Sequence, residues 1–252
     1  MTGHEYLDNL QQQRSVNDTT LQVMRNTRDA VEGHLRKTIG STPRIYYAGS
    51  YGKNTMLDVY HDLDIVVYYP SSTTKTLKDI YWEVHNTLNG AYVVRQKDVA
   101  IRLPYEGGFV VDVVPGRTLD DTFRYANLYR NETDGWLQTS IKVHIETVQQ
   151  SNLRGTMRLI KLWNVRHNLG LRSFFVELLV ARVLKNASLQ GYDDKLLAVF
   201  RYIVNNIQSA QIIDPANSNN VLSDLIPAST KRTVAAQAQG AIDAQYWSQV
   251  VW

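Results

Sequence analysis

The pattern Asp62-Leu63-Asp64, followed at once by the apolar run Ile65–Tyr69, constrains the fold of this chain most strongly. Side chains of a β-strand point alternately to its two faces, so both carboxylates lie on one face and aim at one spot. Two like charges held that close repel each other, and a divalent cation between them relieves the repulsion. Carboxylate oxygens without Cys or His ligands suit Mg²⁺ or Mn²⁺. The pattern therefore predicts a metal site at the start of a strand.

A glycine-serine turn precedes this acidic pair. Gly49 and Ser50 follow the apolar strand Arg44–Ala48, and a second glycine stands at Gly52. Backbone N–H groups and a hydroxyl in such a turn can hold phosphate oxygens. Taken alone, the glycines indicate an ordinary turn, and Asp-Leu-Asp a solvated strand end. Together, in front of an apolar strand, they predict a nucleoside triphosphate bound through the metal, with Gly49 and Ser50 contacting its phosphates.

A third carboxylate, Asp112, stands inside the apolar strand Phe109–Val114. An unpaired buried charge is costly, so such an aspartate is usually protonated, paired with a cation or bound to a metal. Because Asp62 and Asp64 already predict a divalent cation, we assign Asp112 to the same metal site.

Gly-Ser, a downstream Thr55, Asp-x-Asp before an apolar strand and a later-strand aspartate are together similar to the signature of the polymerase-β-like nucleotidyltransferases. The resemblance implies that Asp62, Asp64 and Asp112 are the catalytic residues and that neighbouring strands bring them together. It also implies a two-metal scheme, in which the metals activate the attacking hydroxyl and hold the triphosphate.

Residues 158–180, RLIKLWNVRHNLGLRSFFVELLV, resemble the triphosphate-binding segment of the bacterial CD-NTases (cGAS/DncV-like nucleotidyltransferases) and the oligoadenylate synthases. The resemblance implies that Lys161 and Ser173 are nucleotide-binding residues. A lysine is a suitable point charge for phosphate, and the start of a helix at Ser173 also favours anions. The alternative is a solvated Lys161 and a Ser173 that only caps its helix.

Composition narrows the class of protein. The 252 residues contain no Cys, which excludes disulfides and a thiolate zinc site. The first residues lack the pattern of a signal peptide, and no apolar run reaches transmembrane length, so we expect a soluble, cytoplasmic protein without a membrane partner. A net charge of +3 fits small anionic substrates such as nucleoside triphosphates, and no stable nucleic-acid partner is expected.

The periodicity of apolar residues predicts an α+β chain of two lobes. Residues 1–139 are expected to form a nucleotidyltransferase lobe, and residues 140–252 a helical bundle that completes the nucleotide-binding cleft. In the first lobe we expect a five-stranded mixed sheet with helices on one side, followed by one more strand. The expected helices are Ser15–Ile39 and Thr76–Leu88. The expected strands of the sheet are Arg44–Ala48, Leu63–Tyr69, Tyr92–Gln96, Ala100–Leu103 and Phe109–Val114, and the further strand is Phe123–Arg130. In the second lobe we expect helices Arg154–Val165, Ser173–Leu184, Asp194–Ile207 and Pro227–Trp247.

These features favour a Mg²⁺-dependent nucleotidyltransferase of the CD-NTase type. The resemblance implies that it joins nucleoside triphosphates into a cyclic oligonucleotide second messenger and releases pyrophosphate, in bacterial anti-phage signalling (CBASS) with a separate effector protein. One alternative is a template-independent transferase that extends a linear oligonucleotide or a tRNA end. Another is a catalytically inactive nucleotide-binding regulatory module, against which the complete set of three carboxylates counts.

Five aromatic residues are candidates for stacking on a base, since every base offers a π-face. The sequence singles out none of them: Tyr51, Tyr105, Tyr125, Tyr129 and Trp136.

Overall fold

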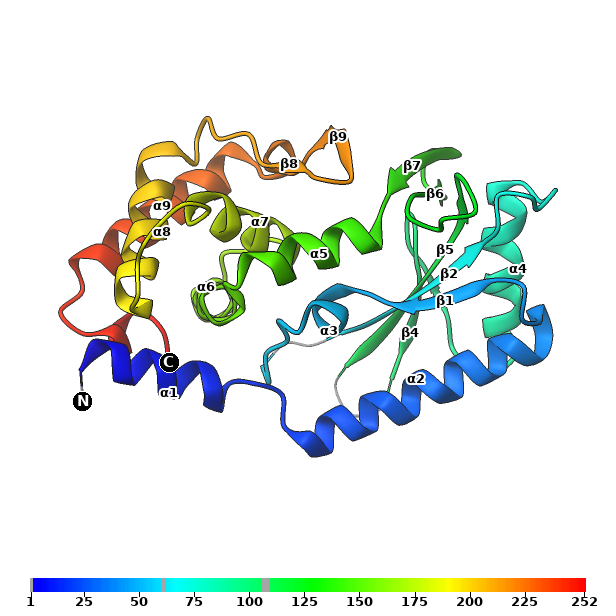
Figure 1. Cartoon of the computed structure of the whole chain (residues 1–252), viewed down its shortest axis with the longest axis horizontal. Helices are drawn as coiled ribbons and strands as arrows, with labels where there is room; N and C mark the ends of the chain where they lie inside the picture. The colour runs from blue at the N-terminus through cyan, green and yellow to red at the C-terminus, as the bar shows by residue number, and fades with distance from the viewer. Residues whose placement is uncertain (1, 60–61, 106–108) are drawn as a thin grey trace. The chain divides into compact units, whose positions relative to one another are not determined.

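The apolar run after Asp64 forms the central strand of a mixed β-sheet. The computed structural model describes residues 2–59, 62–105 and 109–252. In the described part of the chain the sheet has seven strands in the order β1-β2-β5-β4-β3, and β6 pairs with both β5 and β7 (Figure 1). β2 and β5 are parallel, and the other pairs are antiparallel. The strands are β1 (Arg44–Tyr47), β2 (Leu63–Tyr69), β3 (Arg95–Gln96), β4 (Ile101–Pro104), β5 (Val110–Thr118), β6 (Ala126–Arg130) and β7 (Gly135–Thr139).

The two faces of β2 meet different surroundings, as its alternating side chains require. On one face Leu63, Ile65 and Val67 are buried, and the hydroxyl of Tyr69 donates to Glu83 of α4 (Leu77–Asn89). This is the face toward α4 and the long helix α2 (Asp18–Ile39), which contact each other and the strands. The other face carries Asp64 and then the buried side chains of Val66 and Tyr68. The acidic group therefore stands at the edge of an apolar surface.

Three features of the sheet differ from the prediction. Five strands and a sixth were expected, but Gly135–Thr139 adds β7, so the predicted turn at residues 131–135 closes a β6–β7 hairpin. Gly49 and Ser50 were expected in a turn, yet they begin the short helix α3 (Gly49–Lys53). β5 continues through Pro115 to Thr118; Pro115 is in register with Val67 of β2 and lies between the stretches of β5 that pair with β4 and with β6.

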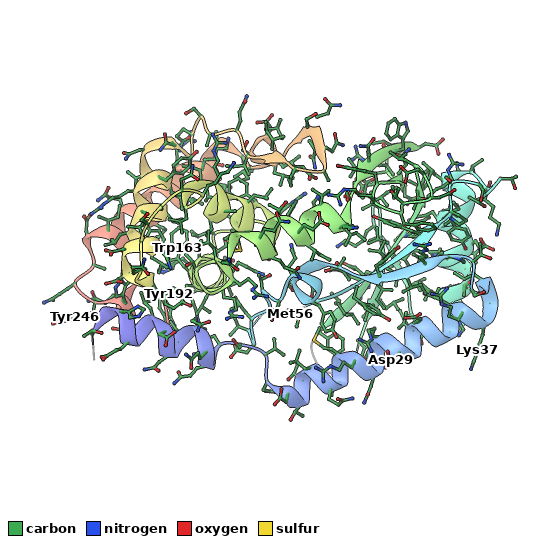
Figure 2. The ribbon with its side chains drawn as sticks, in the orientation of Figure 1. Asp29, Lys37, Met56, Trp163, Tyr192 and Tyr246 are labelled. Atoms are coloured by element: carbon green, nitrogen blue, oxygen red, sulfur yellow. The ribbon has the colours of Figure 1, made fainter. Side chains whose placement is uncertain are left out.

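The second half of the chain is helical, as predicted. Its core contains the fully buried Trp163 and Phe200, whose ring centroids lie 4.9 Å apart, and Figure 2 shows Trp163 among the side chains of these helices. Within residues 2–59, 62–105 and 109–252, every helix is too short or too polar to cross a membrane. The remaining elements are α1 (Gly3–Gln13), α5 (Ile141–Ser151), α6 (Arg154–Arg166), α7 (Ser173–Val183), α8 (Tyr192–Asn206), β8 (Ile213–Asp214), β9 (Asn217–Val221) and α9 (Ala228–Asp243), with 3₁₀ turns at Leu222–Leu225 and Trp247–Gln249.

The chain divides into two units that are not simply its two halves. The helical unit contains residues 2–15, 55–59 and 146–252, and the sheet unit contains the described residues between them. The predicted boundary at 139/140 lies close to the observed one, but the first helix and a short segment before β2 belong to the helical unit. α1 was not predicted because its sequence is largely polar. It joins the helical unit because Leu7 and Leu10 are buried in that core.

Candidate functional site

The sheet unit places two of the predicted carboxylates side by side. In the parallel pairing of β2 with β5, Asp64 stands opposite Asp112, so both project from the same face of strands about 4.8 Å apart. Asp62 is the residue just before β2. Burial raises the pKa of Asp64 to about 6, and the negative charges of Asp112 and Asp62 add to this shift. The charges of Asp112 and Asp62 therefore both act on the Asp64 carboxyl group.

Gly49 lies against the Asp64 carboxylate. Its backbone is in the left-handed region, with φ +57°, and a Cβ added there would stand 1.6 Å from Asp64 Oδ2. The backbone N–H of Ala48 also donates to the carbonyl of Asp64 at 2.9 Å. Only glycine fits this position, because any side chain would occupy the volume of the carboxylate. The structure thus brings Gly49 and the neighbouring Ser50 to the acidic group, while their contact with phosphate stays a prediction.

Asp112 is paired with cations. It is 8% exposed, and Arg102 of β4 donates from Nε to Oδ1 at 2.8 Å and from Nη2 to Oδ2 at 2.7 Å. Lys97 Nζ lies 3.4 Å from Oδ2. Of the three states considered for a buried aspartate, the structure contains the ion-paired one. Sequence reasoning missed Arg102, although an arginine between Ile101 and Leu103 in an alternating strand is a signal that could have found it.

Two lysines also act electrostatically on Asp64. The positive charges of Lys53 and Lys97 lower the pKa of this carboxyl group, against the larger effects of burial and of its acidic neighbours. The site therefore contains three carboxylates, Asp62, Asp64 and Asp112, and three cations from α3, the residue after β3, and β4. These cations lessen a repulsion that they do not cancel.

The donor set is chemically suited to a hard divalent cation, because it consists of carboxylate oxygens on one face of two adjacent strands. In the described ranges, however, His, Asp and Glu side chains do not stand in a group of three with the geometry of a metal site. The oxygens of Asp112 face Arg102 instead. A metal shared by Asp62, Asp64 and Asp112 stays a prediction.

Lys161 is not a solvated helix residue. Its side chain is 4% exposed, and Nζ donates to the backbone carbonyl of Thr55 at 2.8 Å and lies 3.3 Å from Oε1 of the fully buried Glu177. The Thr55 hydroxyl donates to the same carboxylate oxygen at 2.5 Å. This network joins α6, α7 and the segment of residues 55–59 within the helical unit. Ser173 is the first residue of α7, which confirms the predicted helix start, and it is partly exposed.

The aromatic candidates differ in exposure. Trp136 of β7 is 60% exposed, whereas Tyr129 is a buried residue whose hydroxyl donates to Asp134 at 2.6 Å. The ring of Tyr105 stacks on Phe109, with centroids 5.3 Å apart. Tyr51 and Tyr125 are partly buried. The structure therefore makes Tyr129 a core residue of the sheet unit rather than a candidate for stacking.

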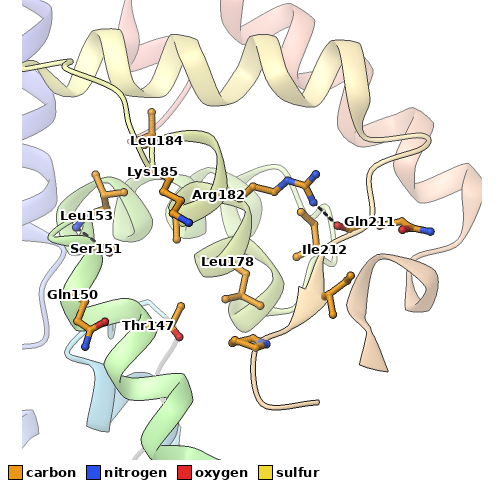
Figure 3. Close-up of a pocket in the computed structure, with 13 residues that line it drawn as sticks. Thr147, Gln150, Ser151, Leu153, Leu178, Arg182, Leu184, Lys185, Gln211 and Ile212 are labelled. Carbon is orange, nitrogen blue, oxygen red and sulfur yellow. Dashed lines mark hydrogen bonds between the residues drawn. The ribbon is translucent and has the colours of Figure 1, made fainter. Parts of the chain in front are cut away.

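A cavity of about 530 Å³ lies in the helical unit, lined by residues of α5, α7 and the chain around β8 (Figure 3). Its walls are largely apolar, with Leu153, Leu178 and Ile212 among the lining residues, and it contains none of the predicted site residues. The Arg182 guanidinium donates to the carbonyl of Gln211, which fastens α7 to the segment before β8. We interpret this cation as structural.

Comparison with known proteins relates the chain to one family. A model of the Second Messenger Oligonucleotide or Dinucleotide Synthetase domain matches residues 1–152. Among curated proteins, the cyclic AMP-AMP-AMP synthase of Escherichia coli (strain MS 115-1) is 26% identical over 210 residues, which are 74% of this chain. The match spans 65% of that relative's own length.

Solved structures share the fold. CdnC of E. coli MS115-1, solved with ATP, superposes with a TM-score of 0.77 at 21% identity and covers 96% of this chain and 91% of that one. CdnE of Elizabethkingia meningoseptica, a cyclic dinucleotide synthase solved with GTP and Apcpp, has a TM-score of 0.74 at 19% identity and covers all of both chains. These likenesses confirm the predicted α+β fold.

The pKa of Asp64 predicts how its removal changes stability. The folded value of about 6 lies above the ordinary 3.8, so the folded state binds this proton more tightly than the unfolded state does. Stability is therefore lost as the pH rises from about 4 to 6. In EDTA, Asp64→Asn should increase the free energy of unfolding by up to about 3 kcal/mol at pH 8 and change it little at pH 4, measured by urea unfolding.

Asp134→Asn is the matched control, because hydrogen bonds from Tyr129 and Lys78 lower the pKa of Asp134. This variant should lose stability above pH 4, the opposite sign. An Asp64→Asn variant that is no more stable than the parent at pH 8 would contradict the raised pKa of Asp64.

The contact of Gly49 with Asp64 predicts a non-additive pair of substitutions. Gly49→Ala should cost more stability beside Asp64 than beside Asp64→Ala, because only the longer side chain occupies the volume of the new methyl group. The left-handed backbone strain is common to both backgrounds and cancels in the double-mutant cycle. We expect a coupling of about 1–3 kcal/mol from urea unfolding of the four proteins. Additivity of the two substitutions would contradict the contact.

Proposed function

Because the chain belongs to the Second Messenger Oligonucleotide or Dinucleotide Synthetase family, we propose that it joins nucleoside triphosphates into a cyclic oligonucleotide and releases pyrophosphate. The observation that supports this most is the register of Asp64 with Asp112 on two parallel strands. Asp62 lies just ahead of this pair, and Gly49 lies against it. A nucleotidyltransferase needs such a group of carboxylates beside a small-residue segment that admits phosphate.

In the proposed reaction, a ribose hydroxyl of one nucleotide attacks the α-phosphorus of a triphosphate in line. A phosphodiester bond forms, the bond from the α-phosphorus to the pyrophosphate oxygen breaks, and the hydroxyl proton passes to solvent. Asp62, Asp64 and Asp112 would hold the divalent cation, Mg²⁺ or Mn²⁺. That cation would stabilise the charge that develops on the phosphoryl oxygens. Repeating the transfer within the linear intermediate closes the ring.

The remaining predicted residues would bind the nucleotide. We propose that Gly49 and Ser50 contact phosphate oxygens, and that Lys161 and Ser173 contact the triphosphate. Lys161 also has a buried ion pair with Glu177, so its substitution would affect stability as well as binding. Ser173 begins an α-helix and is partly exposed, which makes it the cleaner residue to test.

A cyclic product is favoured over a linear one on two grounds. The chain has 27 basic against 24 acidic residues, a modest excess for binding a folded RNA through many phosphate contacts. The curated relative is itself a cyclic AMP-AMP-AMP synthase. A transferase that extends a linear oligonucleotide or a tRNA end remains the alternative function. A role in anti-phage signalling, in the cytoplasm and through a separate effector protein, belongs to the same proposal.

The product distinguishes these functions. The protein is incubated with all four labelled ribonucleoside triphosphates and Mg²⁺ or Mn²⁺, without added nucleic acid, and the products are analysed by mass spectrometry. We expect an oligonucleotide that phosphatase does not change, because ring closure leaves no terminal phosphate. Asp62→Asn combined with Asp64→Asn should abolish it. A phosphatase-sensitive chain, or a requirement for added RNA, would contradict the cyclase function and support the linear transferase.

Ser173→Ala should raise KM for the triphosphate and leave kcat nearly unchanged, because a phosphate contact present throughout the reaction contributes equally to ground and transition states. A charge-assisted hydrogen bond of about 1.5–3 kcal/mol corresponds to roughly a ten- to hundredfold change. Ser229→Ala is the matched control, since Ser229 is also exposed at the start of a helix, α9. Equal KM values for the two variants would show that Ser173 has only a structural role.

A further inference from the structure

Arg102 and Asp112 form the best-defined ion pair in the acidic site. They stand directly opposite each other in the antiparallel pairing of β4 with β5. Two guanidinium nitrogens of Arg102 each donate to a different carboxylate oxygen, at 2.8 and 2.7 Å. The side chain of Asp112 is 11% exposed and that of Arg102 is 30% exposed. Such a fork fixes the plane of the carboxylate as well as its position.

The fork leaves Asp112 able to bind a cation. An ionised carboxylate offers about four lone-pair positions on its two oxygens, and a bidentate arginine uses two of them, one on each oxygen. Lys97 cannot replace this contact, because its single ammonium lies 3.4 Å from one oxygen only and its side chain is 43% exposed. Oδ2 accepts from both Arg102 and Lys97, whereas Oδ1 accepts from Arg102 and keeps a second lone-pair position, in a direction that Arg102 determines.

Without such a partner, Asp112 would be free to turn away from its acidic neighbour. Asp64 stands beside it in register on the neighbouring strand, and two carboxylates that close together repel each other. Rotation of the Asp112 carboxylate would relieve this repulsion, and with it remove the arrangement of the two groups. The bidentate contact opposes that rotation.

We propose that Arg102 is a positioning residue of the acidic site: it holds the Asp112 carboxylate beside Asp64 in the orientation in which both bind one divalent cation. The proposal rests on the proposed function for the identity of the site. The competing possibility is that Arg102 merely occupies Asp112 in place of a cation. The two possibilities predict effects of opposite sign on cation binding. A positioning residue strengthens cation binding, whereas a competitor weakens it.

Mn²⁺ binding to the nucleotide-free protein, measured from the electron paramagnetic resonance signal of free Mn²⁺, tests the proposal without a product. Arg102→Lys keeps the positive charge and loses the fork, so we expect binding about tenfold weaker, the size typical of losing a group that orients a metal ligand. Arg102→Gln should also bind more weakly. Arg95→Gln is the matched control, because Arg95 is exposed on β3 directly opposite Arg102, and its Mn²⁺ binding should equal that of the parent.

Parent-like binding in Arg102→Lys would overturn positioning, and tighter binding in Arg102→Gln would establish competition instead. Thermal unfolding in EDTA identifies any variant that does not fold, and the lysine variant alone then decides the outcome. In the nucleotidyl-transfer assay, both Arg102 variants should lower kcat about tenfold or more and change KM little. If the parent makes no oligonucleotide while Mn²⁺ binding still depends on the fork, the proposed function fails and the positioning role stands.

Discussion

Repulsion between two carboxylates in register is the constraint around which the sheet unit is arranged. Parallel pairing of β2 with β5 fixes the backbone of Asp64 beside that of Asp112, and neither backbone can shift without disturbing a buried ladder. Positive charges from three separate elements, among them the Arg102 fork, lessen this repulsion. Burial is the largest cause of the raised pKa of Asp64, and the negative charges of Asp112 and Asp62 raise it more than the positive charges of Lys53 and Lys97 lower it. Residual negative charge of this kind is what an enzyme needs in order to attract a divalent cation.

The helical unit resolves its buried charge differently. Lys161 and Glu177 neutralise each other, and Thr55 satisfies both of them through its carbonyl and hydroxyl groups. These contacts hold α6, α7 and the segment of residues 55–59 together. Lys161 is also proposed to contact the triphosphate, so its substitution would affect both the packing of the helical unit and nucleotide binding.

The sequence predicted the elements that carry the site residues better than the pairing between those elements. The strand Leu63–Tyr69 and the helix that starts at Ser173 were placed correctly because alternation and capping are local signals. α1 escaped because only two or three of its residues are buried, and β7 because its short pattern resembles a turn. The register of Asp64 with Asp112, and the position of Arg102 opposite Asp112, depend on pairing between distant segments, which no local pattern encodes. The resemblance to a family supplied the first of these and not the second.

The contact between Gly49 and Asp64 couples the two positions in evolution as well as in space. A backbone atom with no room for a methyl group makes every single substitution at 49 costly while the carboxylate is present. If a descendant lost the aspartate, the steric clash would disappear, and alanine or serine at position 49 would cost only the strain of the left-handed backbone. The pair should therefore vary together among relatives, and a sequence with a side chain at 49 would identify a member whose acidic site has fallen out of use.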